Sequence, residues 1–169
     1  RALVNHVVRK TKKLVPPFQL SDAVRFNDAL ALGRGRSYTA PVVGPEDIAV
    51  LQYTGGTTGV SKGAVLLHRN LVANVLQAEA WNQPALSKVP AGEQPTTVCA
   101  LPLHHIFGFT ANMMLSMHLG GCNILIPNPH DIGALLKELA RHRFHSFPAV
   151  NTLFNAMAHH PAFNTVDWS

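Results

Sequence analysis

Residues 51–67 read LQYTGGTTGVSKGAVLL, in which two short apolar runs enclose four Thr or Ser residues, four Gly residues and one Lys. Such a segment offers little apolar side-chain area for burial, and each Gly loses more backbone freedom on folding than other residues do. Packing in a core therefore does not explain it. The pattern instead predicts a loop between two strands that serves a binding function.

The composition of this loop indicates phosphate as its ligand. Small residues allow main-chain N–H groups to point into one concavity, which suits phosphate oxygens. Lys62 adds a full positive charge, which at about 4 Å from a phosphate and an effective dielectric near 20 contributes on the order of 4 kcal/mol before desolvation. Further donors are the hydroxyl groups of Thr54, Thr57, Thr58 and Ser61.

Two other interpretations of the loop are disfavoured, a Walker A loop by its residue order and a flexible linker by its composition. A Walker A loop requires Gly, four residues and then Gly-Lys-Ser/Thr at the start of a helix. Here Ser61 precedes Lys62, Gly63 follows it, and an apolar run comes next. A flexible linker seldom combines paired Thr residues with one Lys between two strands.

Length and composition favour one folded domain. The chain has 169 residues, 47% of them apolar and 14% charged, which is ample for a buried core. Because it begins with Arg1 and stops at Ser169 shortly after an apolar pair, we expect a fragment of a longer protein. Much of the formal charge of +5 lies in residues 9–13, which are interpreted as a solvated helix end rather than a nucleic-acid patch.

The longest apolar stretches contain both cysteines, and none of these stretches is expected to span a membrane. Cys99 and Cys122 both lie in apolar runs, where a buried free thiol in a reducing compartment is expected. Residues 106–126 come nearest to a membrane span. Polar residues and a Gly pair interrupt them, so a helix followed by a buried strand is the better explanation.

Apolar periodicity predicts the order of the elements. Leu135, Leu136 and Leu139 fall on one helical face, and Asp131 is expected to cap that helix. Pro16-Pro17 is expected to end the first helix, and residues 84–95 are expected to form a surface loop. The expected helices are 2–15, 25–32, 70–81, 109–119, 132–142 and 150–159, and the expected strands are 48–53, 63–67, 97–100, 123–126 and 145–147.

Strands that alternate with helices imply parallel pairing through right-handed crossovers. The predicted fold class is therefore α/β, with a partly parallel sheet and flanking helices. We divide the chain into a lead-in segment, residues 1–44, and a second segment, residues 45–169, which holds the predicted phosphate loop.

Several stretches resemble the adenylate-forming superfamily, whose members include acyl-CoA synthetases, peptide-synthetase adenylation domains and beetle luciferases. YTGGTTGVSKGA resembles its phosphate-binding signature, and LLHRNLVANVLQ and LPLHHIFGFT resemble neighbouring segments. ELARHRFHSFPAVNTLFNAM is similar to bacterial long-chain-fatty-acid-CoA ligases. The resemblance covers most of residues 14–169 and implies an incomplete piece of the large N-terminal, AMP-binding domain.

The resemblance implies two half-reactions. A fatty acid carboxylate attacks the α-phosphate of ATP and releases pyrophosphate, and the CoA thiol then displaces AMP. Donors around the β- and γ-phosphates would stabilise the leaving group. Thr54 is the implied protein contact to Mg²⁺, which would complete its shell with phosphates, waters and a carboxylate elsewhere. The implied nucleotide-binding residues are Tyr53, Thr54, Gly55, Gly56, Thr57, Thr58, Gly59, Ser61 and Lys62.

Two histidines lie within the stretch LPLHHIFGFT, residues 101–110. His105 matches a family position beside the reacting carboxylate and phosphate, where it would orient the carboxylate or gate entry; the alternative is a hydrogen-bonded core residue. His104 is the weaker candidate, since that place is commonly aromatic in relatives. The pair His159-His160 is expected to end a helix rather than bind zinc.

The acyl site is implied only in part. By position, Phe147, Val150, Asn151 and Phe154 line the acyl channel or are core residues of a strand and helix. Residues 147–150 read FPAV where relatives often have Thr-Gly-Val, so the preferred acyl length stays open.

The family segments expected further along are absent, namely Tyr-Gly-x-Thr-Glu, the ribose-binding Asp and the C-terminal domain with its catalytic Lys. The chain alone is therefore expected to be inactive. The expected partners are ATP, a long-chain fatty acid and CoA, without nucleic acid, in the cytoplasm or at the inner face of the membrane. The alternatives are an adenylating ligase for a medium-chain or aryl acid, a non-catalytic nucleotide-binding module, and a structural segment that associates through uncovered faces.

Overall fold

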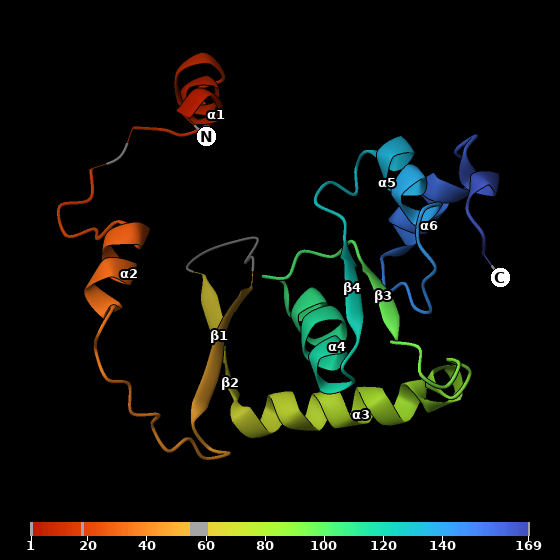
Figure 1. Cartoon of the computed structure of the whole chain (residues 1–169), viewed down its shortest axis with the longest axis horizontal. Coiled ribbons are helices and arrows are strands. Elements are labelled where there is room, and N and C mark those ends of the chain that lie inside the picture. The colour runs from red at the N-terminus through yellow and green to blue at the C-terminus, as the bar shows by residue number, and fades with distance from the viewer. Residues whose placement is uncertain (1, 18, 55–60, 169) are drawn as a thin grey trace. The chain divides into compact units, whose positions relative to one another are not determined.

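A computed structural model describes residues 2–17, 19–54 and 61–168 (Figure 1). The chain divides into two units, Arg1–Val42 and Val43–Ser169. The first unit contains α1 (Ala2–His6), which continues as a π-helix, η1 (Val7–Thr11), and α2 (Phe26–Gly33). The predicted first helix therefore ends earlier than expected. Lys13 adopts a positive φ of 48°, so the backbone leaves the helical conformation before it reaches the two prolines.

The second unit begins with the two strands that flank the phosphate loop. β1 (Ile48–Thr54) and β2 (Lys62–Leu67) pair antiparallel as a hairpin. Both strands were predicted within a residue of these bounds. The chain then enters α3 (His68–Leu86) directly.

Helix α3 extends through a proline that was expected to lie in a surface loop. Pro84 lies inside the helix, and the N–H of Ser87 still donates to the carbonyl of Gln83 at 2.9 Å. A proline this close to the C-terminal end removes a single backbone hydrogen bond from the last turns, so the helix persists. The loop prediction is therefore wrong for residues 84–86.

The parallel pairing expected from alternating strands and helices is found in the next two strands. β3 (Thr96–Cys99) and β4 (Cys122–Leu125) pair parallel, with Thr96 opposite Cys122 and Cys99 opposite Leu125. The predicted strand at 145–147 is reduced to one parallel bridge, between Thr97 and Ser146, on the other side of β3. Pro148 follows, and its missing N–H cannot continue the ladder.

The connection between β3 and β4 is helical but not a regular α-helix. It consists of a π-helix, η2 (Gly108–Met114), followed by α4 (Leu115–His118), where one α-helix was predicted. Asn112 is fully buried and its side-chain N–H donates to the carbonyl of Val98 at 3.1 Å. This hydrogen bond fixes the connecting helix against β3.

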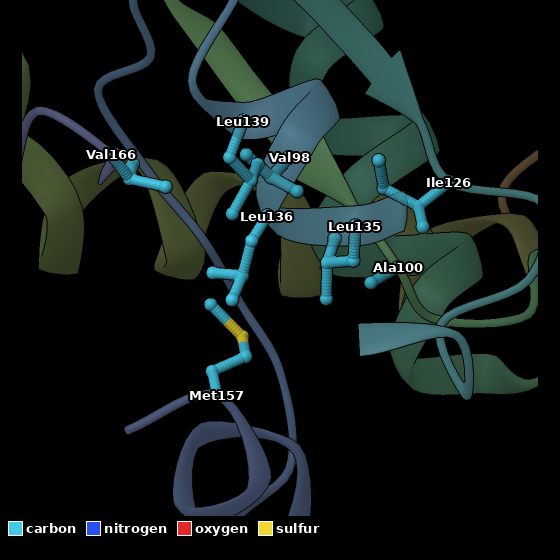
Figure 2. Close-up of a cluster of buried hydrophobic side chains, with 8 residues drawn as sticks. All are labelled: Val98, Ala100, Ile126, Leu135, Leu136, Leu139, Met157 and Val166. Carbon is cyan, nitrogen blue, oxygen red and sulfur yellow. The ribbon is translucent and has the colours of Figure 1, made fainter. Parts of the chain in front are cut away.

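The core lies around β3, β4 and the helix after them (Figure 2). The last elements are α5 (Ile132–Leu139), α6 (Asn151–Ala158) and a short 3-10 helix, η3 (Phe163–Thr165). Three leucines of α5 are buried, and Figure 2 shows Leu139 beside Val98 of β3 and Leu136 directed toward Met157 of α6. The buried cluster consists of Val98, Ala100, Ile126, Leu135, Leu136, Leu139, Met157 and Val166. As predicted, Asp131 caps α5 by accepting a hydrogen bond from the N–H of Ala134 at 3.0 Å.

The two thiols differ, although both were predicted to be buried. Cys99 is buried, and burial raises the pKa of its thiol, whereas Cys122 is exposed at the start of β4. Both are free cysteines. Among the described residues, no helix has the length and apolar content needed to cross a membrane.

Candidate functional site

The β1–β2 hairpin fixes where the phosphate loop begins and ends. Thr54 pairs with Lys62, and Tyr53 pairs with Gly63. Neighbouring strands lie about 4.7–4.9 Å apart, so the two ends of the loop are held side by side. Ser61 and Lys62 are exposed at the end of the loop that enters β2. Because its two ends are adjacent, the loop between β1 and β2 is suited to bind a single ligand with its backbone groups.

Part of the predicted phosphate site falls outside the described residues. This applies to Gly55, Gly56, Thr57, Thr58 and Gly59, and also to the side chain of Thr54. The described members are Tyr53, Ser61, Lys62 and the backbone of Thr54, and the hairpin register brings them together. The assignment of all nine residues to nucleotide binding remains a prediction.

One glycine of the loop has a structural role that was not foreseen. A Cβ atom on Gly63 would lie 3.3 Å from Cε1 and Cζ of the Tyr53 ring. The ring therefore lies across Gly63 from the opposite strand, at the base of the loop. Tyr53 remains 60% exposed, so the other face of its ring is open to solvent.

The base of the hairpin is fastened to the start of α3. The N–H of His68 donates to the carbonyl of Asp47 at 3.0 Å, and the N–H of Arg69 donates to that of Pro45 at 3.0 Å. The side chain of Asn70 accepts a hydrogen bond from the N–H of Leu67 at 2.9 Å. These bonds satisfy N–H groups that a helix start leaves without intrahelical partners. The helix start and the hairpin thus form one connected element.

His105 lies in a tight turn that precedes η2. Its N–H donates to the carbonyl of Pro102 at 3.0 Å, and its carbonyl accepts from the N–H of Phe109 at 2.9 Å. Its ring nitrogen Nδ1 accepts a hydrogen bond from the N–H of Phe107 at 3.2 Å. The side chain is exposed, so the alternative interpretation as a core histidine is wrong. His104 is also exposed.

A shallow cleft connects the hairpin region with the His105 segment. Its lining comes from β2, from α3 and from the segment after His105. The lining residues are Leu66, Asn70, Leu71, Asn74, Ile106, Phe107 and Thr110. Residues that follow the phosphate loop and residues that follow His105 are therefore neighbours in space. The sequence places them about 40 positions apart, and only the packing of α3 against η2 unites them.

A cavity of about 230 Å³ adjoins Phe107 on the other side. Phe107, Ala111 and Leu115 recur at four-residue spacing and form one wall, and α3 supplies Ala78 and Ala85 opposite. Small side chains on facing helices leave this space open. The alanines along residues 78–85 are the signal in the sequence from which this space could have been predicted.

Three polar side chains that line this cavity form hydrogen bonds with nearby protein groups. Asn82 donates to the carbonyl of Ala78 at 2.7 Å, and the hydroxyl of Thr96 donates to the carbonyl of Gln94 at 3.1 Å. The hydroxyl of Ser116 donates to the side-chain oxygen of Asn123 at 3.3 Å. These three groups are paired, whereas the buried ring nitrogen Nε2 of His145, which also lines the cavity, has no hydrogen-bond partner among the described residues. The rest of the lining is mainly apolar and suits an apolar ligand.

The residues predicted to line the acyl channel are divided between two places. Phe147 and Phe154 contact each other edge to face, with ring centroids 5.4 Å apart. Val150 lines a separate cavity beside Leu101 and Pro102, and Asn151 is exposed at the start of α6. From the same stretch, the residues that line the 230 Å³ cavity are His145, Ser146 and Pro148. The acyl-channel role of the four predicted residues remains untested.

The described residues hold no cluster of three His, Cys, Asp or Glu side chains that could bind a metal ion. His159 follows the last residue of α6, as expected for the end of a helix. The predicted contact from Thr54 to Mg²⁺ remains a prediction, because the side chain of Thr54 is outside the described part of the structure.

A sequence model described as "AMP-binding enzyme" matches residues 4–168. The chain belongs to this family of AMP-binding enzymes. The resemblance drawn from the loop and the His105 segment is thereby confirmed at the level of the family.

The chain is also similar in sequence to individual AMP-binding enzymes. The chain is 50% identical over 167 residues to the long-chain-fatty-acid–CoA ligase of Escherichia coli O157:H7, which covers 99% of this chain and 29% of that protein. It is 34% identical over 127 residues to 4-coumarate–CoA ligase 3 of Arabidopsis thaliana, covering 75% of this chain and 22% of that protein. The chain thus spans less than a third of the length of these curated relatives.

The fold agrees with solved members of the family. The crystal structure of ATP-bound MatB from Rhodopseudomonas palustris matches with a TM-score of 0.63 and 26% identity, over 83% of this chain and 27% of that one. The predicted α/β class is therefore confirmed, with small sheets of two strands each among the described residues.

Proposed function

We propose that this chain is the phosphate-loop and acyl-site segment of an enzyme that activates a long-chain fatty acid with ATP and transfers the acyl group to CoA. The observation that carries the proposal is the 50% identity to the long-chain-fatty-acid–CoA ligase of Escherichia coli O157:H7 over nearly the whole chain. The hairpin, the His105 turn and the apolar cavity each provide a part that this chemistry requires.

The hairpin loop would hold the triphosphate of ATP. Its ends are fixed by the pairing of Thr54 with Lys62, and Lys62 leads into β2 from an exposed position. A charge fixed there would stabilise the negative charge that develops on the departing pyrophosphate. The Tyr53 ring lies across Gly63 at the base of this loop.

The fatty acid would enter beside the His105 turn. The exposed His105 ring would orient the carboxylate for attack on the α-phosphate, and the alkyl chain would occupy the cavity behind Phe107. The cavity volume of about 230 Å³ lies below the range of about 300–1,000 Å³ typical of complete ligand pockets. The cavity therefore accommodates part of a long chain, and the remainder of the site would come from other segments of the protein.

Mg²⁺ and CoA are the further groups that the proposed reaction requires. Bound Mg²⁺ would neutralise phosphate charge, with Thr54 as the one proposed protein ligand from this chain. CoA would supply the thiol that accepts the acyl group. We place the reaction in the cytoplasm, with peripheral contact at the inner face of the membrane as the route to an apolar substrate.

An aryl acid is the second candidate substrate, because the chain is 34% identical to 4-coumarate–CoA ligase 3. The apolar lining of the cavity suits an alkyl chain and an aromatic ring alike. Competition between palmitate and 4-coumarate, measured as the ratio of kcat/KM values, distinguishes the two substrates.

The proposal is tested with the complete protein encoded by the reading frame, by following pyrophosphate release with ATP, magnesium, palmitate and CoA. We expect turnover, and we expect K62A combined with T57V to reduce kcat/KM for ATP by roughly a hundredfold or more, since two phosphate contacts are lost. K137A, which removes an exposed Lys on α5, is the matched control and should leave the rate unchanged.

Normal ATP kinetics in the double variant would contradict the assignment of the loop. Absence of palmitate-dependent turnover in the complete protein would contradict the proposed substrate. The 169-residue chain by itself is expected to show no acyl-CoA synthesis, and titration calorimetry with ATP and magnesium reports whether it retains nucleotide binding.

A further inference from the structure

The turn from Pro102 to Phe109 holds His105 by three separate hydrogen bonds. Two involve its backbone, with the Pro102 carbonyl at 3.0 Å and the Phe109 N–H at 2.9 Å. The third runs from the N–H of Phe107 to Nδ1 of the His105 ring, at 3.2 Å. The ring is therefore oriented by its own chain, two residues ahead, and not by a carboxylate.

A backbone N–H can only donate, so Nδ1 must be the acceptor in this third bond. In a neutral imidazole one nitrogen accepts and the other carries the proton. The hydrogen bond from Phe107 consequently selects the tautomer with the proton on Nε2. The exposed end of the ring then presents an N–H donor.

The turn depends on a glycine. Gly108 is buried, and a Cβ atom at this position would lie 2.5 Å from the carbonyl oxygen of Pro102 and 3.2 Å from Cβ of Leu101. The oxygen in question is the one that accepts the hydrogen bond from the N–H of His105. A side chain at Gly108 would displace backbone rather than a flexible side chain, so the turn would have to open.

We infer that the Pro102–Phe109 turn presets His105 as a neutral hydrogen-bond donor through Nε2, and that Gly108 is the positioning residue that keeps the turn closed. The inference rests on the proposed function for the identity of the acceptor, which is an anionic oxygen of the carboxylate or of the α-phosphate. In this role His105 binds and orients an oxygen, and it removes no proton.

Donation from a preset tautomer suits this reaction. A carboxylate nucleophile is already ionised near neutral pH and requires no general base. What it does require is orientation and stabilisation of negative charge, to which a fixed N–H donor contributes without rearranging during the reaction.

The tautomer is measured directly on the 169-residue chain, independently of activity. With ¹⁵N-labelled histidine, long-range ¹H–¹⁵N correlation spectra distinguish a protonated ring nitrogen from an unprotonated one. We expect Nε2 of His105 to carry the proton and Nδ1 to be bare. In G108A the preference should be lost, whereas G133A, whose Cβ meets no atom closer than 3.7 Å, should retain it.

The donor role is measured in the complete protein with two isosteric variants. The amide nitrogen of Gln lies where Nε2 lies, so H105Q retains a donor at the outer position, whereas H105N places its amide near Nδ1. We expect kcat/KM for the fatty acid to stay within about threefold of wild type in H105Q and to fall roughly tenfold to a hundredfold in H105N, as for loss of a hydrogen bond to a charged group.

The possible results separate this inference from the proposed function. A proton found on Nδ1, or equal losses in H105Q and H105N, would overturn the donor assignment while leaving the ligase activity in place. No loss in either variant would remove His105 from the site altogether. G108A with a wild-type ring spectrum would overturn the role of Gly108 alone.

Discussion

The hairpin that carries the phosphate loop and the parallel pair β3–β4 are both two-stranded, but they are stabilised differently. β3 and β4 lie against α5 and α6, and Val98 and Leu136 in this layer are fully buried. In the hairpin, Leu51, Tyr53 and Val65 are each more than half exposed. The parallel layer is held by burial, whereas the hairpin is held by its backbone ladder and its connection to α3.

This difference suits the ligand-binding role proposed for the hairpin loop. A two-stranded hairpin is marginally stable by itself, so its position depends on the elements that fasten it. Here the start of α3 is bonded back to residues 45 and 47 at the foot of β1. The hairpin ladder and the bonds to α3 thus hold the two ends of the loop in place without a packed core around β1 and β2.

The largest expected difference between the two regions concerns core substitutions. Leu136→Ala should lower the free energy of unfolding by about 2–5 kcal/mol, since it leaves a cavity in a fully buried cluster. Leu51→Ala should cost no more than about 1 kcal/mol, because the side chain is already 54% exposed. Urea unfolding of the chain, followed by circular dichroism, measures both.

Leu136→Met is the control that conserves volume, and it should cost less than about 1.5 kcal/mol. Equal losses of unfolding free energy for Leu136→Ala and Leu51→Ala would show that the hairpin depends on burial as much as the parallel layer does. The proposed difference between the two regions would then be wrong.

Glycine substitutions sharpen the contrast at the level of the backbone. A Cβ atom on Gly121, just before β4, would lie 2.8 Å from the Pro95 carbonyl oxygen, which is bonded to the N–H of Cys122. Gly121→Ala should therefore cost about 1–3 kcal/mol by overpacking. Gly63→Ala meets the Tyr53 ring, which is exposed and can turn aside, so its effect should stay within about 0.5 kcal/mol.

The same unfolding assay compares the two glycine variants. A loss for Gly63→Ala as large as that for Gly121→Ala would mean that the Tyr53 ring is held rigidly, and the hairpin would then be a packed element.

Local patterns in the sequence were sufficient to predict much of this fold. Leucine spacing identified α5, Asp131 identified its first turn, and the Thr- and Gly-rich stretch identified the loop between β1 and β2. Each of these signals is contained within a few neighbouring residues. The helix and strand periods are therefore visible without knowledge of the fold.

Features that depend on distant backbone could not be predicted in this way. A glycine is required at position 108 because the Pro102 carbonyl lies where a Cβ atom would be. The neighbouring residues in the sequence give no indication of this contact. Cys122 lies in an apolar run and is nevertheless exposed, at the first residue of β4. The cavity behind Phe107 needs α3 and η2 side by side, which is a property of packing.

A smaller effect is expected from the helix caps, which occur in both regions. Asp131→Ala at the start of α5 and Asn70→Ala at the start of α3 should each lower the free energy of unfolding by about 0.5–2 kcal/mol, since each leaves a backbone N–H without its acceptor. Thermal unfolding of the two variants, with Asp131→Asn as a control that keeps a capping oxygen, measures this. A loss only at Asp131 would indicate that α3 is held by the hairpin and not by its own first turn.

The smallest expected effect is on stability at acid pH, and it comes from one carboxylate on α5. Glu138 on α5 accepts hydrogen bonds from His142 at 2.9 Å and Arg141 at 3.4 Å, and the bond with His142 is the main cause that lowers its pKa below the ordinary value of 4.5. A carboxylate whose pKa is lower in the folded state stabilises the fold above the unfolded value, and this stabilisation is lost as pH falls through the folded value.

Glu138→Gln should therefore reduce the dependence of stability on pH below about pH 4.5 and leave the rest of the curve unchanged. The change should be small, because Glu138 is exposed to solvent, which screens such pairs. His142→Ala should have a similar effect, since it removes the main partner. Urea midpoints measured at neutral pH and in the acid range test this, and an unchanged acid slope in both variants would show that the pair contributes nothing to the stability of α5.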